Sequence, residues 1–273
     1  MASKKPMHGI KQPLGAKKRF GQHFLRDASV IKKILAAVPW EKAEKIVEVG
    51  PGHGALTGPL YEKLQQMGKT TDLMLVELDR DLLPELEERF PDAHIVNADA
   101  THADWKKHTQ GKPWVLVGNL PYNAGTAIVN EAFWGEHPPL AAVIMLQKEV
   151  GERMLATPPD MSLLSVAIQV KTEGKRVCTV KPGAFVPPPK VDSIVILLTH
   201  REMYAGEKAK RVVSLAKKGF AHARKQLRQT LAHEGLGEKE RLGEVLESYG
   251  LSALARPEEL PLAAWATIDE HRK

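Results

Sequence analysis

The sequence of 273 residues predicts an α/β protein, with one domain built on an open parallel sheet and a small C-terminal domain made only of helices. Two observations lead to this prediction. Up to about residue 200, short apolar runs of strand length alternate with longer segments of helical period, as in successive β-α-β units. Beyond that point, helical patterns separated by glycine and proline replace the strands. We therefore expect a sheet domain over 17–200, a helical domain over 201–273 and a flexible basic tail over 1–16.

The bulk composition narrows the class of protein. The formal net charge of +6 and the isoelectric point of about 9.2 make a polyanionic partner plausible. A single cysteine, Cys178, excludes a disulfide framework and a cysteine-based zinc site, and fits a reducing cytosol. The histidines show no metal-ligand spacing, and no apolar stretch is long enough to span a membrane. We expect a cytoplasmic monomer that holds no metal.

The first expected strand, residues 45–49, leads into a glycine-rich turn that precedes a helix. In this arrangement, glycines allow a tight turn and let the backbone approach a nucleotide closely. Gly50 and Gly52 are the residues expected beside the ligand. The turn also fits the fingerprint of dinucleotide-dependent dehydrogenases, so by itself it does not identify the nucleotide.

Acidic residues follow the next two expected strands. Residues 72–76 end at Glu77, whose carboxylate can accept hydrogen bonds from both hydroxyls of a ribose. Residues 94–96 lead to Asp99, which is placed either for an adenine amino group or as the cap of the next helix.

The fourth expected strand carries the motif around which the chain is organised. Its apolar run, residues 114–117, is expected to end at Gly118, and a helix is expected from about Thr126. The residues between them include Asn119, Leu120, Pro121 and Tyr122. The amide oxygen of Asn119 and the carbonyl of Leu120 can each accept one N–H of an amino group on a flat ring, and Tyr122 offers a face for stacking. The motif therefore predicts chemistry on a base amine, with an ordinary turn after the strand as the alternative.

The remainder of the first domain predicts the far side of the sheet. We expect a strand over 141–146, helices over 147–155 and 161–170, and an antiparallel pair over 175–180 and 193–198. The loop inside that pair is rich in proline, which holds Phe185 in one place. Phe185 is predicted as a second ring against the base, and the alternative is an anchor in the core.

The C-terminal domain is expected to begin with a long helix that carries a basic stripe. No acid occurs between Glu207 and Glu234, and on a helical wheel the basic residues lie opposite the apolar ones. Because a solvated helix usually mixes both signs, a stripe of one sign predicts contact with a phosphate backbone. The residues expected to bind nucleic acid are Lys217, Lys218, Arg224, Lys225 and Arg228.

Together these motifs resemble the ribosomal RNA adenine dimethyltransferases. The matching stretches follow the family's order from Lys17 to Leu231: KKRFGQHFL, EVGPGHGALT, VELDRDL, NADA, GNLPYN, LQKEVGERM, PGAFVPPPKVDS and ARKQLRQTL. The resemblance implies a Rossmann-like sheet that binds S-adenosylmethionine as methyl donor. The residues expected at the donor are His23, Leu25, Gly50, Gly52, Glu77, Asp99 and Asn119, and those expected at the reacting base are Asn119, Leu120, Pro121, Tyr122 and Phe185.

Two positions depart from the family pattern. The family often has Asn where His23 stands, and commonly has Gly-Asp where Asn97-Ala98-Asp99 stands. Neither change removes a group that the chemistry requires.

The implied reaction is dimethylation of the N6 amines of two adjacent adenosines near the 3′ end of small-subunit ribosomal RNA, and the implied partner is the small ribosomal subunit. Three alternatives stay open. One is a dinucleotide-dependent dehydrogenase, which leaves Asn119–Tyr122 unexplained. The second is a non-catalytic RNA-binding assembly factor, and the third is a methyltransferase of large-subunit ribosomal RNA.

Overall fold

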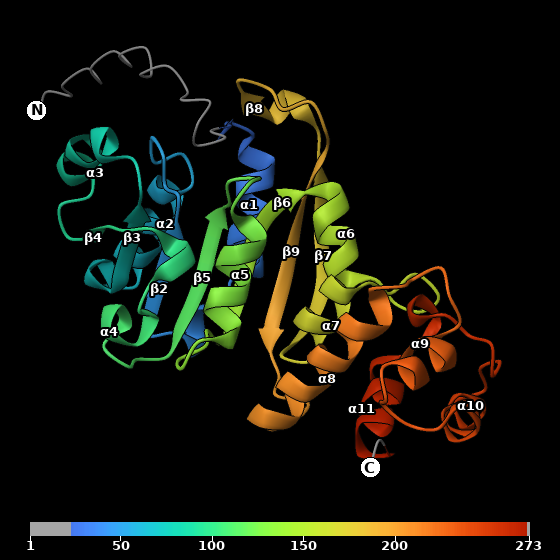
Figure 1. Cartoon of the computed structure of the whole chain (residues 1–273). Helices are drawn as coiled ribbons and strands as arrows, with labels where there is room; N and C mark the ends of the chain where they lie inside the picture. Colours follow the sequence, from blue (N-terminus) through green and yellow to red (C-terminus); the bar gives the residue numbers. More distant parts are fainter. Residues whose placement is uncertain (1–22, 272–273) are drawn as a thin grey trace, which may run out of the picture.

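A computed structural model describes residues 23–271 of the chain and confirms the α/β architecture (Figure 1). The predictions for the tail over 1–16, and for the stretch from Lys17 to Gln22, lie outside the described residues. No helix within the described part of the chain is long and apolar enough to cross a membrane.

Seven strands form the main sheet in the order β4-β3-β2-β5-β6-β9-β7. β2, β3, β4, β5 and β6 are parallel, whereas β9 is antiparallel to both of its neighbours. The chain builds outward from β2 to β4 and then returns to place β5 on the other side of β2, so the strand order reverses between β2 and β5. Ligands bind at such a reversal, outside the carboxyl ends of the strands. The strands span Lys45–Val49 (β2), Leu73–Glu77 (β3), His94–Asn97 (β4), Trp114–Asn119 (β5), Ala141–Gln147 (β6), Thr172–Val180 (β7) and Ser193–His200 (β9).

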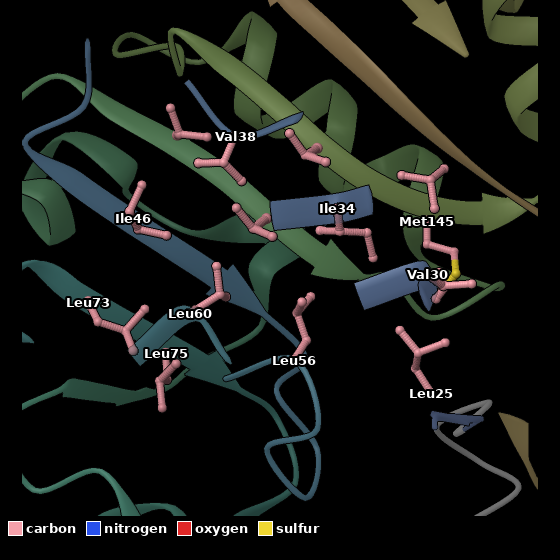
Figure 2. Close-up of a cluster of buried hydrophobic side chains, with 14 of the residues drawn as sticks. Leu25, Val30, Ile34, Val38, Ile46, Leu56, Leu60, Leu73, Leu75 and Met145 are labelled. Carbon is pink, nitrogen blue, oxygen red and sulfur yellow. The ribbon is translucent and has the colours of Figure 1, made fainter. Parts of the chain in front are cut away.

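Helices cover both faces of the sheet because alternate strand residues point to opposite sides. Ile46 packs into one hydrophobic cluster with α1 and α2, and Val47 packs into the other with α5. Figure 2 shows the first cluster, in which Ile34 of α1 and Leu60 of α2 lie over the strand side chains. The helices of this domain span Ala28–Ala37 (α1), Thr57–Gln66 (α2), Leu83–Arg89 (α3), Trp105–Thr109 (α4), Gly125–Trp134 (α5), Lys148–Leu155 (α6) and Leu163–Gln169 (α7).

The strand that carries the central motif is longer than predicted. β5 continues through Gly118 and Asn119, although Gly118 was expected to end it. A Cβ on Gly118 would lie 2.5 Å from the carbonyl oxygen of Val49. The glycine therefore permits close approach of β2 and β5 rather than ending the strand.

A two-stranded ribbon, β1 (Phe24–Leu25) and β8 (Phe185–Val186), lies outside the main sheet. Figure 1 shows β8 near the edge at which β5 ends. The ribbon joins the segment before α1 to the proline-rich loop between β7 and β9. It brings His23 within reach of the motif on β5.

The C-terminal helices are α8 (Gly206–Phe220), α9 (Leu227–His233), α10 (Lys239–Ser248) and α11 (Leu262–His271). They share a hydrophobic cluster with Val166 and Val170 of the α7 region, so the small domain packs on the sheet domain through α7. The prediction that one long helix carries the basic stripe is wrong. α8 ends at Phe220, and a turn separates it from α9.

Candidate active site

A cavity of about 320 Å³ opens at the carboxyl ends of β2, β3, β4 and β5. It collects most of the predicted site residues, although they come from separate strands and from the segment before α1. The predicted residues that line it are His23, Gly50, Gly52, Glu77, Asp99, Asn119, Leu120, Pro121 and Tyr122. Leu25 and Phe185 are absent from its walls.

The glycine-rich turn forms one wall of the cavity. Gly50 and Gly52 have φ angles of 70° and 56°, in the left-handed region that side chains with a Cβ rarely adopt. A Cβ on Gly52 would also lie 2.9 Å from the ring of Phe24. The turn therefore has a backbone conformation that favours glycine, and at Gly52 the absence of a Cβ lets the ring of Phe24 pack closely against it.

Glu77 ends β3 beside this turn, and its carboxylate is engaged on both oxygens. Its Oε1 accepts a hydrogen bond from the N–H of Asp79 at 2.8 Å, and its Oε2 accepts one from the N–H of Gly52 at 3.1 Å. Burial raises the pKa of Glu77, and these backbone N–H groups oppose the shift. Because a carboxylate has about four lone-pair sites, Glu77 keeps capacity to accept ligand hydroxyls while it holds the turn in place.

A second acid, Glu48, lies on β2 directly below the turn, and sequence reasoning did not single it out. It is buried, and its Oε2 has no hydrogen-bond partner among the described residues. Burial raises its pKa to about 8, against an opposing effect of Thr57 and with a smaller contribution from the charge of Glu77. Glu48 is therefore largely protonated at neutral pH.

Asp99 caps the next turn, as one of the two predicted roles requires, and it also lines the cavity. Its Oδ1 accepts hydrogen bonds from the N–H and the hydroxyl of Thr101, at 2.9 and 2.7 Å, and so caps the short turn Ala100–His102. These bonds hold the pKa of Asp99 below its ordinary value. Asp99 also lines the cavity, and the bonds to Thr101 leave its Oδ2 for a ligand.

Asn119 is oriented by the segment before α1. Its Nδ2 donates a hydrogen bond to the carbonyl oxygen of His23 at 2.7 Å. The amide oxygen of Asn119 and the carbonyl of Leu120 accept no hydrogen bond from any residue in 23–271. Two acceptors therefore remain at the end of β5, as the motif predicted.

Tyr122 stands beside these acceptors and is fixed from two sides. Its hydroxyl shares a hydrogen bond of 2.6 Å with the hydroxyl of Ser193. The ring of His23 lies 5.4 Å from the Tyr122 ring between centroids, and the Nδ1 of His23 donates to the carbonyl of Pro187 at 2.9 Å. Burial raises the pKa of Tyr122, so the side chain remains a neutral phenol.

The side chains of two predicted site residues do not line the cavity. The ring of Phe185 is only 2% exposed and packs in the core, so it does not present the second stacking surface that was predicted. Leu25 is 3% exposed and lies in the same cluster as Val30 and Met145 (Figure 2). Both side chains are drawn inward because β1 pairs with β8, which turns Leu25 and Phe185 toward the sheet.

The structure adds cavity residues that the sequence did not reveal. Leu78 follows Glu77, lines the cavity and leaves 48% of its surface exposed, which provides an apolar face beside the acid. Phe24 lies against the glycine turn, where its ring packs edge-on against His53. A large apolar residue directly after a strand-end acid was the available signal for Leu78, whereas nothing in the sequence places Phe24 against the turn.

The basic stripe is largely neutralised in three dimensions. Arg211 pairs with Asp269 and Lys208 with Glu270, both on α11, while Lys210 pairs with Glu207 and Lys218 with Glu234. Arg228 is half-buried against α10, and its Nε has no partner within the part of the chain described. The predicted cations that stay exposed and outside any ion pair with residues 23–271 are Lys217, Arg224 and Lys225, which we call the cationic turn.

An open sheet with a glycine turn, strand-end acids and an Asn-Leu-Pro-Tyr motif defines the chain as an S-adenosylmethionine-dependent methyltransferase. The family model for ribosomal RNA adenine dimethylase matches residues 14–268, and the chain belongs to that family. In the described residues, no group of three or more side chains is arranged to hold a metal ion.

Similar proteins agree with this assignment. The chain is 38% identical to "Ribosomal RNA small subunit methyltransferase A" of Ralstonia nicotianae, over 95% of this chain and 91% of that protein. It is 39% identical to the protein of the same name in Synechococcus sp. CC9605, over 93% of this chain and 94% of that protein. Among solved structures, the 23S rRNA methyltransferase ErmE superposes with a TM-score of 0.74 at 25% identity, over 91% of this chain and 99% of ErmE. A dimethyladenosine transferase from Plasmodium falciparum shares the fold with a TM-score of 0.73 at 22% identity, over 90% of this chain and 96% of that one.

Proposed function

We propose that this protein transfers methyl groups from S-adenosylmethionine to the N6 amines of two adjacent adenosines near the 3′ end of small-subunit ribosomal RNA. The observation on which this depends is the pair of unengaged acceptors, the Asn119 amide oxygen and the Leu120 carbonyl, in the same cavity as Glu77. The name shared by the curated relatives supports the small subunit as partner.

The donor end of the cavity has groups that suit S-adenosylmethionine. Glu77 accepts the ribose hydroxyls, Asp99 accepts from the adenine amine through Oδ2, and Leu78 covers the face of the adenine ring. The open turn at Gly50 and Gly52 admits the methionine portion to the backbone. When bound, the donor supplies an electrophilic methyl group on a cationic sulfur.

The acceptor end prepares the amine. The lone pair of an adenosine amine is delocalised into the ring, which makes it a poor nucleophile. Asn119 and Leu120 accept hydrogen bonds from its two N–H groups, direct the lone pair at the methyl group and stabilise the positive charge that develops on nitrogen. As the N–C bond forms, the S–C bond of the donor breaks to leave a neutral thioether, and the nitrogen then releases one proton to solvent. Tyr122 holds the unstacked base by its face.

Binding of the RNA is assigned to the cationic turn. In Figure 1, α8 starts near the end of β9 and leads into the small domain toward α9. Exposed cations on the small domain suit contact with a phosphate backbone. We propose that the protein acts as a monomer in the cytoplasm.

The similarity to ErmE, at 25% identity, favours the alternative of a large-subunit substrate. The small-subunit methyltransferases are more similar to this chain, at 38% and 39% identity, and favour the small subunit. A dinucleotide-dependent dehydrogenase leaves the acceptor pair at Asn119 and Leu120 without a role. If the protein were an assembly factor without catalysis, the hydrogen bond by which His23 orients Asn119 would have no role.

The proposal is tested with small ribosomal subunits from a strain that lacks this methylation. Wild-type protein and labelled donor are expected to modify two adjacent adenosines, which reverse transcription locates. Asn119→Ala is expected to slow single-turnover transfer on the order of 10²–10³-fold, since it removes one preorganised contact to the reacting amine. Melting temperature serves as the control for folding, and the rates are compared at saturating donor and RNA because Asn119 is also expected at the donor. Transfer within about threefold of wild type would rule out the catalytic role of Asn119, since the expected loss is far larger.

A further inference from the structure

A second hollow, of about 390 Å³, opens next to the acceptor end of the active site. This hollow has no part in the roles assigned above. Some of its residues belong to the LQKEVGERM stretch, which is one of the stretches that resemble the family. Its walls are formed by Gln147, Lys148, Glu149, Glu152, Val191 and Asp192.

The hollow is connected to the active site through Ser193. The Ser193 hydroxyl holds the Tyr122 hydroxyl at 2.6 Å, and Ser193 pairs with Gln147 across β9 and β6. Asp192 precedes Ser193, and its carbonyl accepts a hydrogen bond of 2.9 Å from the N–H of Lys148. The hollow therefore starts one residue away from the ring on which the target base stacks.

Like the exposed Glu149, Gln147 is a polar side chain of this hollow that makes no hydrogen bond or ion pair with the described residues. It ends β6 and occupies the N-cap position of α6, yet its side chain makes no cap hydrogen bond. Its amide bonds to no residue in the described range 23–271 and is half-buried. A glutamine amide can donate to N7 and accept from the N6 amine of adenine at once.

Two of the other walls suit the remaining parts of a nucleotide, whereas Glu149 adds a carboxylate that is paired with no described residue. Val191 is 47% exposed and offers an apolar surface to the face of a base. The Nζ of Lys148 lies 3.9 Å from Glu152, which has a closer partner in Arg176 at 2.8 Å. Asp192 is paired with Lys181 at 2.7 Å, so its charge does not repel a phosphate strongly. Lys148 can therefore approach a phosphate next to the bound base.

We propose that this hollow is a subsite for the adenosine adjacent to the one being methylated, with Gln147 reading its N6 amine and N7. The assignment rests on the proposed function, because a substrate with two adjacent adenosines must place the second one beside the first. One sugar–phosphate unit separates the two bases, and the bond from Tyr122 to Ser193 joins their two sites. With this subsite, the enzyme recognises the neighbouring adenosine as well as the adenosine that it methylates.

The test pairs a protein variant with a change in the RNA. Gln147→Leu keeps the size of the side chain and removes its amide. Small subunits are reconstituted with adenosine, or with purine riboside, which lacks the N6 amine, at each position next to a target in turn. On adenosine, Gln147→Leu is expected to slow single-turnover transfer about tenfold, within the range for removal of a bidentate base contact. On purine riboside, which lacks the amine but keeps N7, the variant is expected to lose less rate than on adenosine, because only one of the two contacts of Gln147 is left to remove.

The control is Gln66→Leu, at the exposed end of α2, which is expected to behave as wild type with both RNAs. An equal loss of rate on both RNAs would show that Gln147 acts through structure and would overturn the subsite, as would no loss on either. An inactive wild-type protein would instead overturn the proposed function and the subsite with it.

The subsite has a second, independent consequence. A neighbour that already carries two methyl groups on N6 has no N–H left for Gln147 to accept. Gln147→Leu is therefore expected to slow modification of whichever adenosine is methylated first more than transfer to the second, for which at most the contact to N7 is left to lose. Equal slowing at both positions would contradict the assignment.

Discussion

The replacement Glu77→Gln is expected to separate the donor site from the rest of the enzyme. The variant has nearly the shape of the wild-type side chain but carries an amide where the carboxylate was. In the structure, both carboxylate oxygens accept backbone N–H bonds, from Asp79 at 2.8 Å and Gly52 at 3.1 Å. The amide can satisfy one of these N–H groups with its oxygen, while its NH₂ faces the other.

Two effects follow for Glu77→Gln, and they are measured apart. Loss of the charged acceptor for the ribose is expected to weaken donor binding by about 1.5–3 kcal/mol, roughly 10- to 150-fold in Kd. Loss of one N–H partner in a buried turn is expected to lower the free energy of unfolding by about 1–3 kcal/mol. Isothermal calorimetry with S-adenosylmethionine gives the first quantity, and urea unfolding without ligand gives the second.

The control is Glu62→Gln, on the exposed surface of α2, which changes the same charge without touching the cavity. It is expected to bind the donor as wild type does. A folded Glu77→Gln variant that binds the donor with wild-type affinity would refute the assignment of Glu77 to the ribose.

Three other parts of the structure can be tested in the same way. Replacing the three residues of the cationic turn with Gln is expected to lower the salt dependence of subunit binding, by about one unit of slope for each phosphate that the variant no longer binds. Lys210→Gln is the control, since Lys210 is already paired with Glu207; an unchanged slope in the triple variant would place the RNA elsewhere. Because burial raises the pKa of Glu48 from 4.5 to about 8, the folded chain keeps a proton that the unfolded chain releases in this pH range. The wild-type melting temperature is therefore expected to fall between pH 5 and pH 8 relative to Glu48→Gln, and parallel curves would contradict a buried neutral acid. Gly118→Ala is expected to lower the free energy of unfolding by about 1–3 kcal/mol, since its Cβ meets the Val49 carbonyl; an unchanged urea midpoint would show that β2 and β5 separate without cost.

Sequence patterns were sufficient for the parts of the site that follow directly from parallel strands. Apolar runs located the five parallel strands β2 to β6 to within two residues, and the residues after them fall at one edge of the sheet because parallel strands end on the same side. Glu77, Asp99 and Asn119 therefore meet in one cavity, as expected from strand ends alone. The antiparallel pair β7 and β9 was also predicted, although its order, with β9 between β6 and β7, was not.

Only the tertiary structure decided the contacts between segments distant in the chain. The pairing of β1 with β8 turns Phe185 into the core and brings the His23 carbonyl to Asn119. The packing of α11 on α8 brings acids to a helix whose own sequence shows a basic stripe. Local periodicity records which face of an element is apolar, but it carries no information on which distant element covers that face. For this reason the sequence was sufficient to predict the polar groups at the strand ends. Which aromatic rings and which cations remain exposed depends on the packing of distant segments, and only the fold decided it.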